Sequence, residues 1–368
     1  MSKAAELANL IGNINAGGGG VNRNVIINGA MNVAQRGTSS TGIGASSGYF
    51  TCDRWKITTG NTAGRLTMTQ DSSAPSGFAN SIKLDCTTAD TSIAADEITI
   101  LGQSLEGQNV QAFAKGTSDA KPFVVSFYVK GNASATYVAE LFDHDNTRNI
   151  TQAFSVTTDW ARVELTFPAD TTGALDDDNA SSLTFQIWIH AGSTYSGGTF
   201  ADNTWGSVTQ ANRYAGSRTS FFDSTDRTFF ITGVQLEVGQ NPTEFEHEPY
   251  ERTLTKCQRY FYRIQGDDDD MTGIAGYSES TSAARFPIVY PVIMRATPSF
   301  ELSGTCRCQG GTADGANFTS GLVITNENTN FTASALRVTG TSNLGAADRG
   351  YNLQFKANTS RISFDAEL

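Results

Sequence analysis

The sequence has few of the residues on which metal binding and phosphate recognition depend. Its three histidines, His144, His190 and His247, are widely spaced, and none belongs to a pair with metal-ligand spacing. Lysine and arginine number 26 against 37 acidic residues, which gives a net charge of −11, and the basic residues are scattered. This composition argues against a zinc site, and against nucleic acid or an anionic membrane as a partner.

Disulfides and a secretory signal are not expected either. The five cysteines are odd in number, and Cys306-Arg-Cys308 is too close for a zinc hairpin and lacks a second pair. These two residues are predicted to be free thiols on opposite faces of one strand. The N-terminus has no apolar core of signal-peptide length. We therefore expect a chain that folds in a reducing cytoplasm, with no membrane insertion and no cofactor or metal.

Motifs for catalysis are present only in fragments. Gly44-Ala-Ser-Ser-Gly48 fits the nucleophile-elbow pattern, but it lacks the strand before and the helix after that the motif needs. The acidic runs 176–178 and 267–270 could gather Ca²⁺, yet neither has the spaced ligand pattern, so solvated turns are predicted. A glycosidase needs a pair of carboxylates across a cleft. The 37 acidic residues contain many possible pairs, and the sequence does not single out one of them. No catalytic residue is predicted.

The abundant residue types indicate an all-β protein. Charged residues make up only 17% of the chain, whereas glycine, serine, threonine and asparagine separate short runs of β-branched and aromatic residues. The intervals between these runs are too long for a meander of tight hairpins, which favours a jelly-roll-like β-sandwich over residues 21–250. A smaller C-terminal β-sandwich is predicted for residues 251–368. Alternating or apolar runs lie at 123–130, 163–167, 183–190 and 229–236, and a long loop is predicted at 191–226.

Residues 1–20 are predicted to form a separate N-terminal segment. Residues 3–11 match one amphipathic helix, which Ser2 caps and Gly12 ends, and the tetraglycine 17–20 is expected to act as a swivel. An isolated helix this short is marginal in water, so it needs a partner, either sister chains or a socket on another protein; a frayed tail is the alternative. The apolar residues of the predicted helix are Ala4, Leu7, Ala8, Leu10 and Ile11.

Several motifs together carry a specific resemblance. Residues 229–236 are apolar on both faces, as in a central strand, and a second strand is expected just beyond Pro242. They overlap the motif Ile231-Thr-Gly-Val-Gln-Leu-Glu-Val-Gly239. Further motifs are Phe245-Glu-His-Glu-Pro-Tyr250, Cys257-Gln-Arg-Tyr-Phe-Tyr262, Asn24-Val-Ile-Ile-Asn-Gly-Ala-Met-Asn-Val-Ala-Gln-Arg-Gly37, Cys52-Asp-Arg-Trp55, Ser126-Phe-Tyr-Val-Lys-Gly131 and Trp160-Ala-Arg-Val-Glu-Leu-Thr-Phe167.

Residues 21–265 resemble, in these motifs and their order, tail-fibre and related virion structural proteins of bacteriophages. The resemblance implies a particle component that faces the host, assembles as a homotrimer and has no catalytic residues. It also implies a location in the virion after assembly in the host cytoplasm, with the N-terminal helix contacting other virion proteins. Residues 266–368 match that family less tightly.

Polar and aromatic side chains that alternate with core residues form the candidate binding face. We expect Tyr128, Gln186, Trp188 and His190 on one open sheet face, with Trp205 on a loop nearby. Aromatic rings stack on sugars while amides and imidazoles bind their hydroxyls; contact with a neighbouring subunit or domain is the alternative. The predicted function is a trimeric tail fibre or receptor-binding protein for a bacterial surface polysaccharide. A head fibre or capsid decoration protein and a polysaccharide depolymerase are the alternatives.

Overall fold

The computed structural model is mostly β-structure and divides into two compact units, residues 1–253 with Leu368, and residues 254–367. The predicted all-β class, with a jelly-roll-like sandwich, a smaller C-terminal sandwich and a short N-terminal helix, is confirmed. In the part of the chain that the structure describes, no helix has the length and apolar character to cross a membrane. The predicted swivel at 17–20 and the acidic residues 268–270 lie outside the described residues. The described residues are 2–15, 22–267, 271–309, 317–319, 324–327, 330–339 and 349–368.

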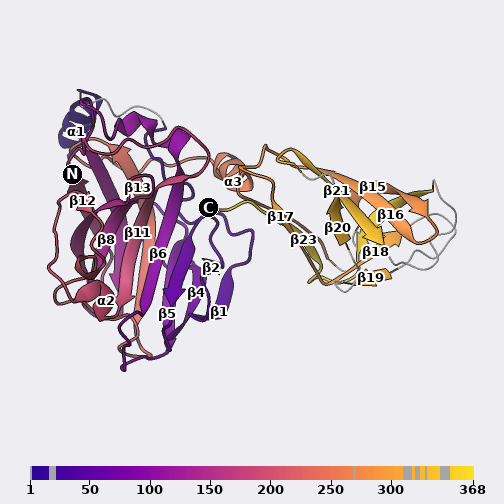
Figure 1. Cartoon of the computed structure of the whole chain (residues 1–368), viewed down its shortest axis with the longest axis horizontal. Helices are drawn as coiled ribbons and strands as arrows, with labels where there is room; N and C mark the ends of the chain where they lie inside the picture. The colour runs from indigo at the N-terminus through magenta and orange to yellow at the C-terminus, as the bar shows by residue number, and fades with distance from the viewer. Residues whose placement is uncertain are drawn as a thin grey trace. The chain divides into compact units, whose positions relative to one another are not determined.

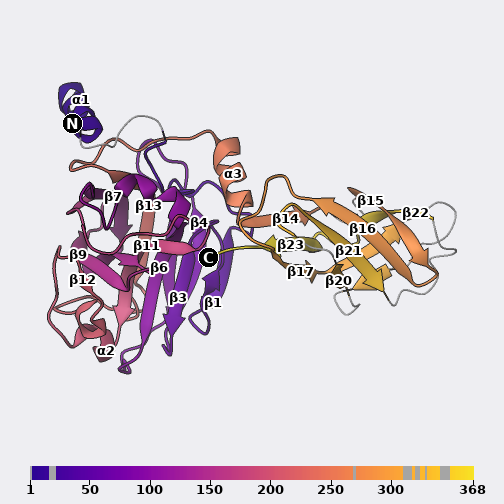
Figure 2. The same cartoon turned by 45° about the horizontal axis from the view of Figure 1, so that its top comes forward.

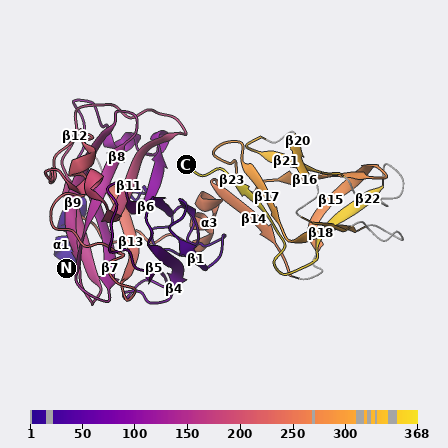
Figure 3. The ribbon, with the colours of Figure 1, turned by 60° about the horizontal axis from the view of Figure 1, so that its bottom comes forward.

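The first unit consists of two antiparallel sheets packed face to face. Figure 1 shows β8, β11 and β6 side by side, and Figure 3 separates this layer from the layer of β7, β13 and β5. In spatial order, one sheet contains β1 (Ser39–Ile43), β4 (Arg65–Asp71), β5 (Ser81–Thr88), β13 (Thr228–Val238), β7 (Phe123–Gly131) and β10 (Ala161–Phe167). The other contains β12 (Gly206–Ser207), β9 (Arg148–Val156), β8 (Ala135–Asp143), β11 (Ser181–Ala191), β6 (Ile98–Glu106), β3 (Lys56–Gly60) and β2 (Gly48–Tyr49).

The core lies between these sheets and follows the period-two pattern of the strands. Leu183, Phe185, Ile187 and Ile189 of β11 are fully buried on the inner face. Phe185 meets Phe127 of β7 across the sandwich, with ring centroids 5.9 Å apart. The predicted alternation is thus confirmed for both strands. Two 3₁₀ turns, η1 (Gly107–Asn109) and η2 (Gln111–Phe113), connect β6 to β7.

β13 is a central strand, as its apolar sequence predicts, and a bulge interrupts it. Gly233 has a φ of 63° where the register with β7 shifts. A Cβ there would lie 2.7 Å from Phe78 Cζ, so only glycine fits. The second strand expected beyond Pro242 does not exist. Instead, the buried side chains of Gln235 and Glu237 accept hydrogen bonds from the backbone N–H groups of Glu246 and Thr243, respectively, both at 2.8 Å. These bonds take the place of a strand partner for residues 243–246.

The second unit has two sheets around its own core. Phe286, Tyr290, Met294, Phe355 and Phe364 are buried there. Figure 2 shows β14, β23 and β17 together at one end of this unit. They span Phe261–Gln265, Arg361–Asp365 and Ser299–Ser303, and follow the helix α3 (Tyr250–Gln258) in the chain. The larger sheet has the order β19 (Asn317–Thr319), β18 (Thr305–Gln309), β22 (Gly350–Phe355), β15 (Met271–Ser280), β16 (Ala283–Val289), β21 (Ala333–Thr339) and β20 (Ile324–Glu327).

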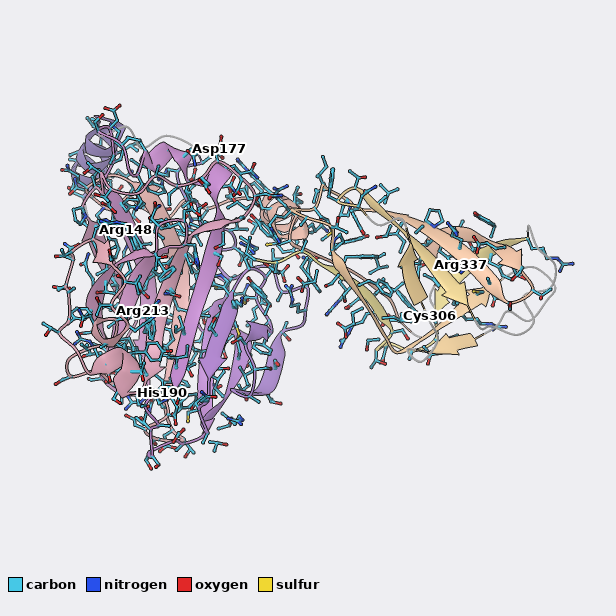
Figure 4. All side chains as sticks on the ribbon, in the orientation of Figure 1. Arg148, Asp177, His190, Arg213, Cys306 and Arg337 are labelled. Atoms are coloured by element: carbon cyan, nitrogen blue, oxygen red, sulfur yellow. The ribbon has the colours of Figure 1, made fainter. Side chains whose placement is uncertain are left out.

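Cys306 and Cys308 are free thiols, as predicted, but both point into this core (Figure 4 labels Cys306). The expectation of opposite faces was wrong, because residues two apart in a strand share a face. Burial raises the pKa of each thiol to about 12. We therefore expect neither to react with iodoacetamide at pH 8 in the folded protein and both to react in guanidinium, as followed by peptide mass spectrometry. Rapid labelling of the native protein would contradict this burial.

The N-terminal helix α1 (Lys3–Asn15) is longer than predicted. Ser2 caps it as expected, since the Ala5 N–H donates to Ser2 Oγ at 3.3 Å. Gly12 does not end the helix, because a single internal glycine costs only about 1 kcal/mol. Its apolar stripe is open: Leu7 is 57% and Ile11 49% exposed. Ala4 and Ala8 are exposed as well, and Leu10 is half-buried.

Candidate functional site

A groove of about 320 Å³ lies on the outer face of the sheet that contains β3, β6, β8 and β11. Its middle is set by Gly102 of β6, which pairs with Lys56 of β3 on one side and Gln186 of β11 on the other. A Cβ at Gly102 would approach the Phe185 carbonyl oxygen to 2.9 Å, so no side chain fills this place. The apolar lining consists of Ile98, Ile100, Phe142, Trp188 and Tyr195, and the polar lining of Lys56, Thr58, Ser104, His144, Thr184, Gln186, Gln210 and Arg213.

One wall of the groove comes from the long excursion between β11 and β13. This segment contains the short helix α2 (Ser193–Ser196), β12 and the 3₁₀ turn η3 (Gln210–Asn212). It folds back over β11, so that the guanidinium of Arg213 lies 4.5 Å from the ring centre of Trp188. The Tyr195 ring packs on the same tryptophan at 5.5 Å between centroids. Figure 4 labels Arg213 over the face of this sheet.

A buried carboxylate beneath the groove holds its polar side chains in place. Glu140 of β8 accepts hydrogen bonds from Trp188 Nε1 at 2.6 Å, Gln186 Nε2 at 2.5 Å and Asn149 Nδ2 at 2.6 Å. Arg213 donates to both oxygens of Glu140, from Nε at 3.0 Å and Nη2 at 2.9 Å. These donors occupy the acceptor capacity of a carboxylate. Glu140 therefore positions other groups and is closed to a ligand.

A chain of hydrogen bonds along the other side of the groove ends at a histidine. Ser104 Oγ lies 3.0 Å from Thr184 Oγ1, which lies 2.7 Å from His144 Nε2. Partial desolvation lowers the pKa of His144 below 6.5, so the imidazole is neutral at pH 7. Among the lining residues that the structure describes, none is Asp or Glu. The groove thus offers apolar surface, hydroxyls, amides and cationic donors.

Two of the predicted face residues line this groove. Gln186 is half-buried in it, as expected for an outward side chain of β11. Trp188 also lies at the groove but is fully buried, so the expectation of an exposed stacking ring was wrong. The covering groups, Tyr195 and Arg213, belong to the same chain rather than to a neighbour.

His190 extends the same strand but does not reach the groove. It is fully buried, with Nε2 2.9 Å from Glu97 Oε2 and Nδ1 2.8 Å from Ser220 Oγ. Burial, opposed by Glu97, lowers its pKa below 6.5. These two contacts join the end of β11 to the loop before β6 and to the segment before β13. The expectation that His190 is open to a ligand was therefore wrong.

Tyr128 and Trp205 lie elsewhere in the unit. Tyr128 belongs to β7, in the opposite sheet, and its ring packs 5.4 Å from that of Phe78. The alternation of a strand does not tell which sheet it joins. For this reason, the expectation that Tyr128 shares a face with the residues of β11 was wrong. Trp205 donates from Nε1 to the Pro168 carbonyl at 2.9 Å, and its ring covers the ammonium of Lys115 at 5.1 Å. Neither residue lines the groove.

Apart from Gln186 and Trp188, the sequence pattern missed the lining of the groove, including Phe142, Tyr195 and Arg213, and it missed the buried Glu140 beneath it. The sequence did contain a signal for Glu140, because this charged residue lies inside the apolar run 135–143. A buried charge needs partners. Tyr195 stood out only as one of several isolated aromatic residues in the excursion. The acidic run 176–178 is exposed, as expected for a solvated turn; Figure 4 labels Asp177 there.

No family model and no curated protein matches the chain. Among solved structures, it is similar to a family 11 carbohydrate-binding module from Clostridium thermocellum in complex with a β-1,3-1,4-mixed-linked tetrasaccharide, with 12% identity, a TM-score of 0.27, and coverage of 57% of this chain and 98% of that one. TmCBM61 in complex with β-1,4-galactotriose gives 10% identity, a TM-score of 0.29, and coverage of 59% and 99%.

A further similarity is to the enzymatically active domain of tailspike protein 4 of bacteriophage CBA120. Identity is 12% and the TM-score 0.28, with 59% of this chain and 21% of the tailspike chain covered. Likeness at this level does not assign a function to this chain.

Proposed function

We propose that this protein is a non-catalytic module that binds a glycan chain in the groove over β3, β6, β8 and β11. The observation that carries the proposal is the combination of an open groove of about 320 Å³ with partly exposed rings and fixed polar groups in its lining. Phe142 and Tyr195 present apolar surface of the kind that stacks on a pyranose ring. Gln186 and Gln210 supply amide groups for hydroxyls.

The held position of the polar groups supports binding. Gln186 and Arg213 are both bonded to the buried Glu140, so a ligand does not have to order them. Preorganisation of this kind reduces the entropic cost of association. The lack of Asp and Glu among the described lining residues supports recognition rather than hydrolysis, which needs two carboxylates at the scissile bond.

We further propose that the protein is part of a bacteriophage particle, a trimeric tail fibre or receptor-binding protein that attaches to a bacterial surface polysaccharide. The motifs of residues 21–265 support this role through their resemblance to such proteins. The exposed stripe of Leu7 and Ile11 on α1 supports a contact with other virion proteins or sister chains. Several copies on one particle would multiply weak contacts. Immunogold labelling of virions separates a tail fibre from a head fibre or capsid decoration protein.

Tyr195→Ala is expected to weaken glycan binding about tenfold, or about 1.4 kcal/mol, because it removes a partly exposed ring from the groove. A glycan array identifies the ligand, and isothermal titration calorimetry then compares the proteins. Tyr277→Ala, which removes an exposed ring of β15 in the other unit, is the matched control and should bind like wild type. Unchanged affinity of the folded Tyr195 variant, or a wild type that binds no glycan, would refute the groove as the binding site.

A further inference from the structure

The floor of the groove is polar at one end and apolar at the other. Three successive cross-strand pairs of β6 and β11 form it: Ser104 with Thr184, Gly102 with Gln186, and Ile100 with Trp188. Beyond the last pair, Ile98 and Tyr195 are half-buried and present part of their apolar surface. A ligand in the groove therefore meets hydroxyls at one end and aliphatic and aromatic surface at the other.

The amide of Gln186, in the middle of the groove, has a fixed orientation. Its Nε2 donates to Glu140 Oε2 at 2.5 Å, and a carboxylate only accepts hydrogen bonds. The amide therefore cannot be turned the other way round. Its carbonyl oxygen, Oε1, is left as an acceptor for a ligand beside Gly102, where no side chain fills the floor.

The amide of Gln210, in the wall of the groove, is fixed in the opposite sense. Arg213 Nη1 donates to Gln210 Oε1 at 2.9 Å, and a guanidinium has no acceptor. The Nε2 group of this exposed residue is therefore left to donate. Because Arg213 is itself bound to Glu140, one buried ion pair orients both amides. The groove thus presents one oriented acceptor and one oriented donor.

An acetamido group on a sugar ring matches these features together. Its N–H needs an acceptor, its carbonyl oxygen needs a donor, and its methyl group needs apolar surface. A sugar hydroxyl can bond to either amide, but it has no methyl group to bury against Ile98 and Ile100. Burial of a methyl-sized group and one additional hydrogen bond each raise an affinity several-fold.

We propose that the groove recognises a sugar that carries an acetamido group. The N–H of this group donates to Gln186 Oε1, its carbonyl oxygen accepts from Gln210 Nε2, and its methyl group packs at the end formed by Ile98 and Ile100. This inference rests on the proposed glycan-binding function and names its ligand class. Each of these contacts is made by a neutral group, so the recognition should not depend on salt.

The test compares oligosaccharides that differ only in this group. Hexamers of β-1,4- and β-1,6-linked N-acetylglucosamine are titrated beside glucose hexamers of the same linkage, which carry a hydroxyl instead, and beside their N-formyl forms, which keep the amide and lack the methyl group. Wild type is expected to bind an acetamido hexamer about tenfold more tightly than its glucose counterpart, with the N-formyl form between them.

One matched pair of variants tests the assignment of the donor. Gln210→Glu keeps the size of the side chain and an oxygen for Arg213, but it replaces the outward donor by an acceptor. This variant should bind the acetamido and glucose hexamers with equal affinity in calorimetry. The control Gln265→Glu changes an exposed glutamine of β14 in the other unit and should keep the tenfold preference of wild type.

Each outcome has a separate meaning. Equal affinity of wild type for both forms would overturn the acetamido ligand and leave glycan binding intact, and a preference that persists in Gln210→Glu would overturn the role of Gln210. If no hexamer binds, a glycan array decides. Bound glycans that all carry acetamido sugars would support the inference, and bound glycans without them would overturn it alone. An array on which nothing binds would overturn the proposed function as well.

Discussion

Replacing Glu140 by alanine is expected to lower the free energy of unfolding by about 3–5 kcal/mol, because it removes one partner of a buried ion pair. Arg213 would keep its charge beneath the groove without a counter-ion. Trp188 Nε1 and the Gln186 and Asn149 amides would lose an acceptor at the same time. Binding in the groove should also be lost, since Gln186 and Arg213 would no longer be held. Urea denaturation and glycan titration measure the two effects.

Two further variants separate charge from shape at this position. Glu140→Gln keeps the volume and one acceptor oxygen, and should be destabilised less than Glu140→Ala. Glu164→Ala removes an exposed carboxylate of β10 that is 3.1 Å from Arg162, and should change stability by less than about 1 kcal/mol. If Glu140→Ala lowered the free energy of unfolding by less than about 1 kcal/mol, the buried network would not be what holds the groove.

Lys115→Met is expected to destabilise the protein by a similar amount, about 3–5 kcal/mol at pH 7. The ammonium of Lys115, just after η2, is fully buried, 2.5 Å from Asp143 Oδ2 and 3.1 Å from Asp170 Oδ2. It also donates to the carbonyl oxygens of Thr172 at 3.0 Å and Gly173 at 2.9 Å. Methionine fills the space of the side-chain stem but leaves the buried Asp143 without its cation, while Asp170 keeps its pair with Arg148. The control Lys83→Met removes a half-buried lysine of β5 from its surface pair with Asp85 and should have an effect below about 1 kcal/mol.

The effect of Lys115→Met should depend on pH. Burial alone would raise the pKa of Asp170, but hydrogen bonds from Arg148, the Thr172 N–H and Lys115 hold this pKa below 3.8. A lowered pKa in the folded state contributes stability above the unfolded value, and this contribution is lost as the pH falls through the folded value. The difference in free energy of unfolding between wild type and Lys115→Met should therefore become smaller from pH 7 toward pH 3. An equal difference at both pH values would assign the loss to packing.

The strands were predictable from the sequence, but their assignment to sheets was not. The alternating pattern of residues 123–130 and 183–190 correctly predicts which residues of β7 and β11 point inward. It does so because one face of each strand packs in the core and the other does not. The same pattern holds whichever sheet a strand joins. Tyr128 and Trp188 were therefore assigned to one face, although their strands lie in opposite layers of the sandwich.

The groove escaped prediction because it depends on contacts far apart in sequence. Arg213 reaches Glu140 across 73 positions, and no local pattern encodes that pairing. By contrast, Asn28 and Asn24, from the quoted motifs, have structural roles: Asn28 binds Val33 main-chain atoms at 2.8 and 3.0 Å, and Asn24 Oδ1 accepts the Ile26 N–H at 3.0 Å and the distant Leu236 N–H at 3.1 Å. The motifs that make the sequence distinctive thus form the scaffold, while most of the groove lies outside them.

The wall that carries Tyr195 and Gln210 has a consequence for how such a protein can change its ligand. Every residue from 193 to 212 is described, and none of them is buried. The segment is held at its two ends, where the Gly192 N–H donates to the Glu97 carbonyl at 2.8 Å and the Tyr214 N–H to that of Tyr195 at 2.8 Å. Between those ends, Tyr195, Phe200 and Trp205 pack against the core and β12 pairs with β9. Substitutions at exposed positions such as Gln210 alter what the groove touches and leave that packing alone. Ligand choice can therefore diverge quickly on a scaffold that stays the same.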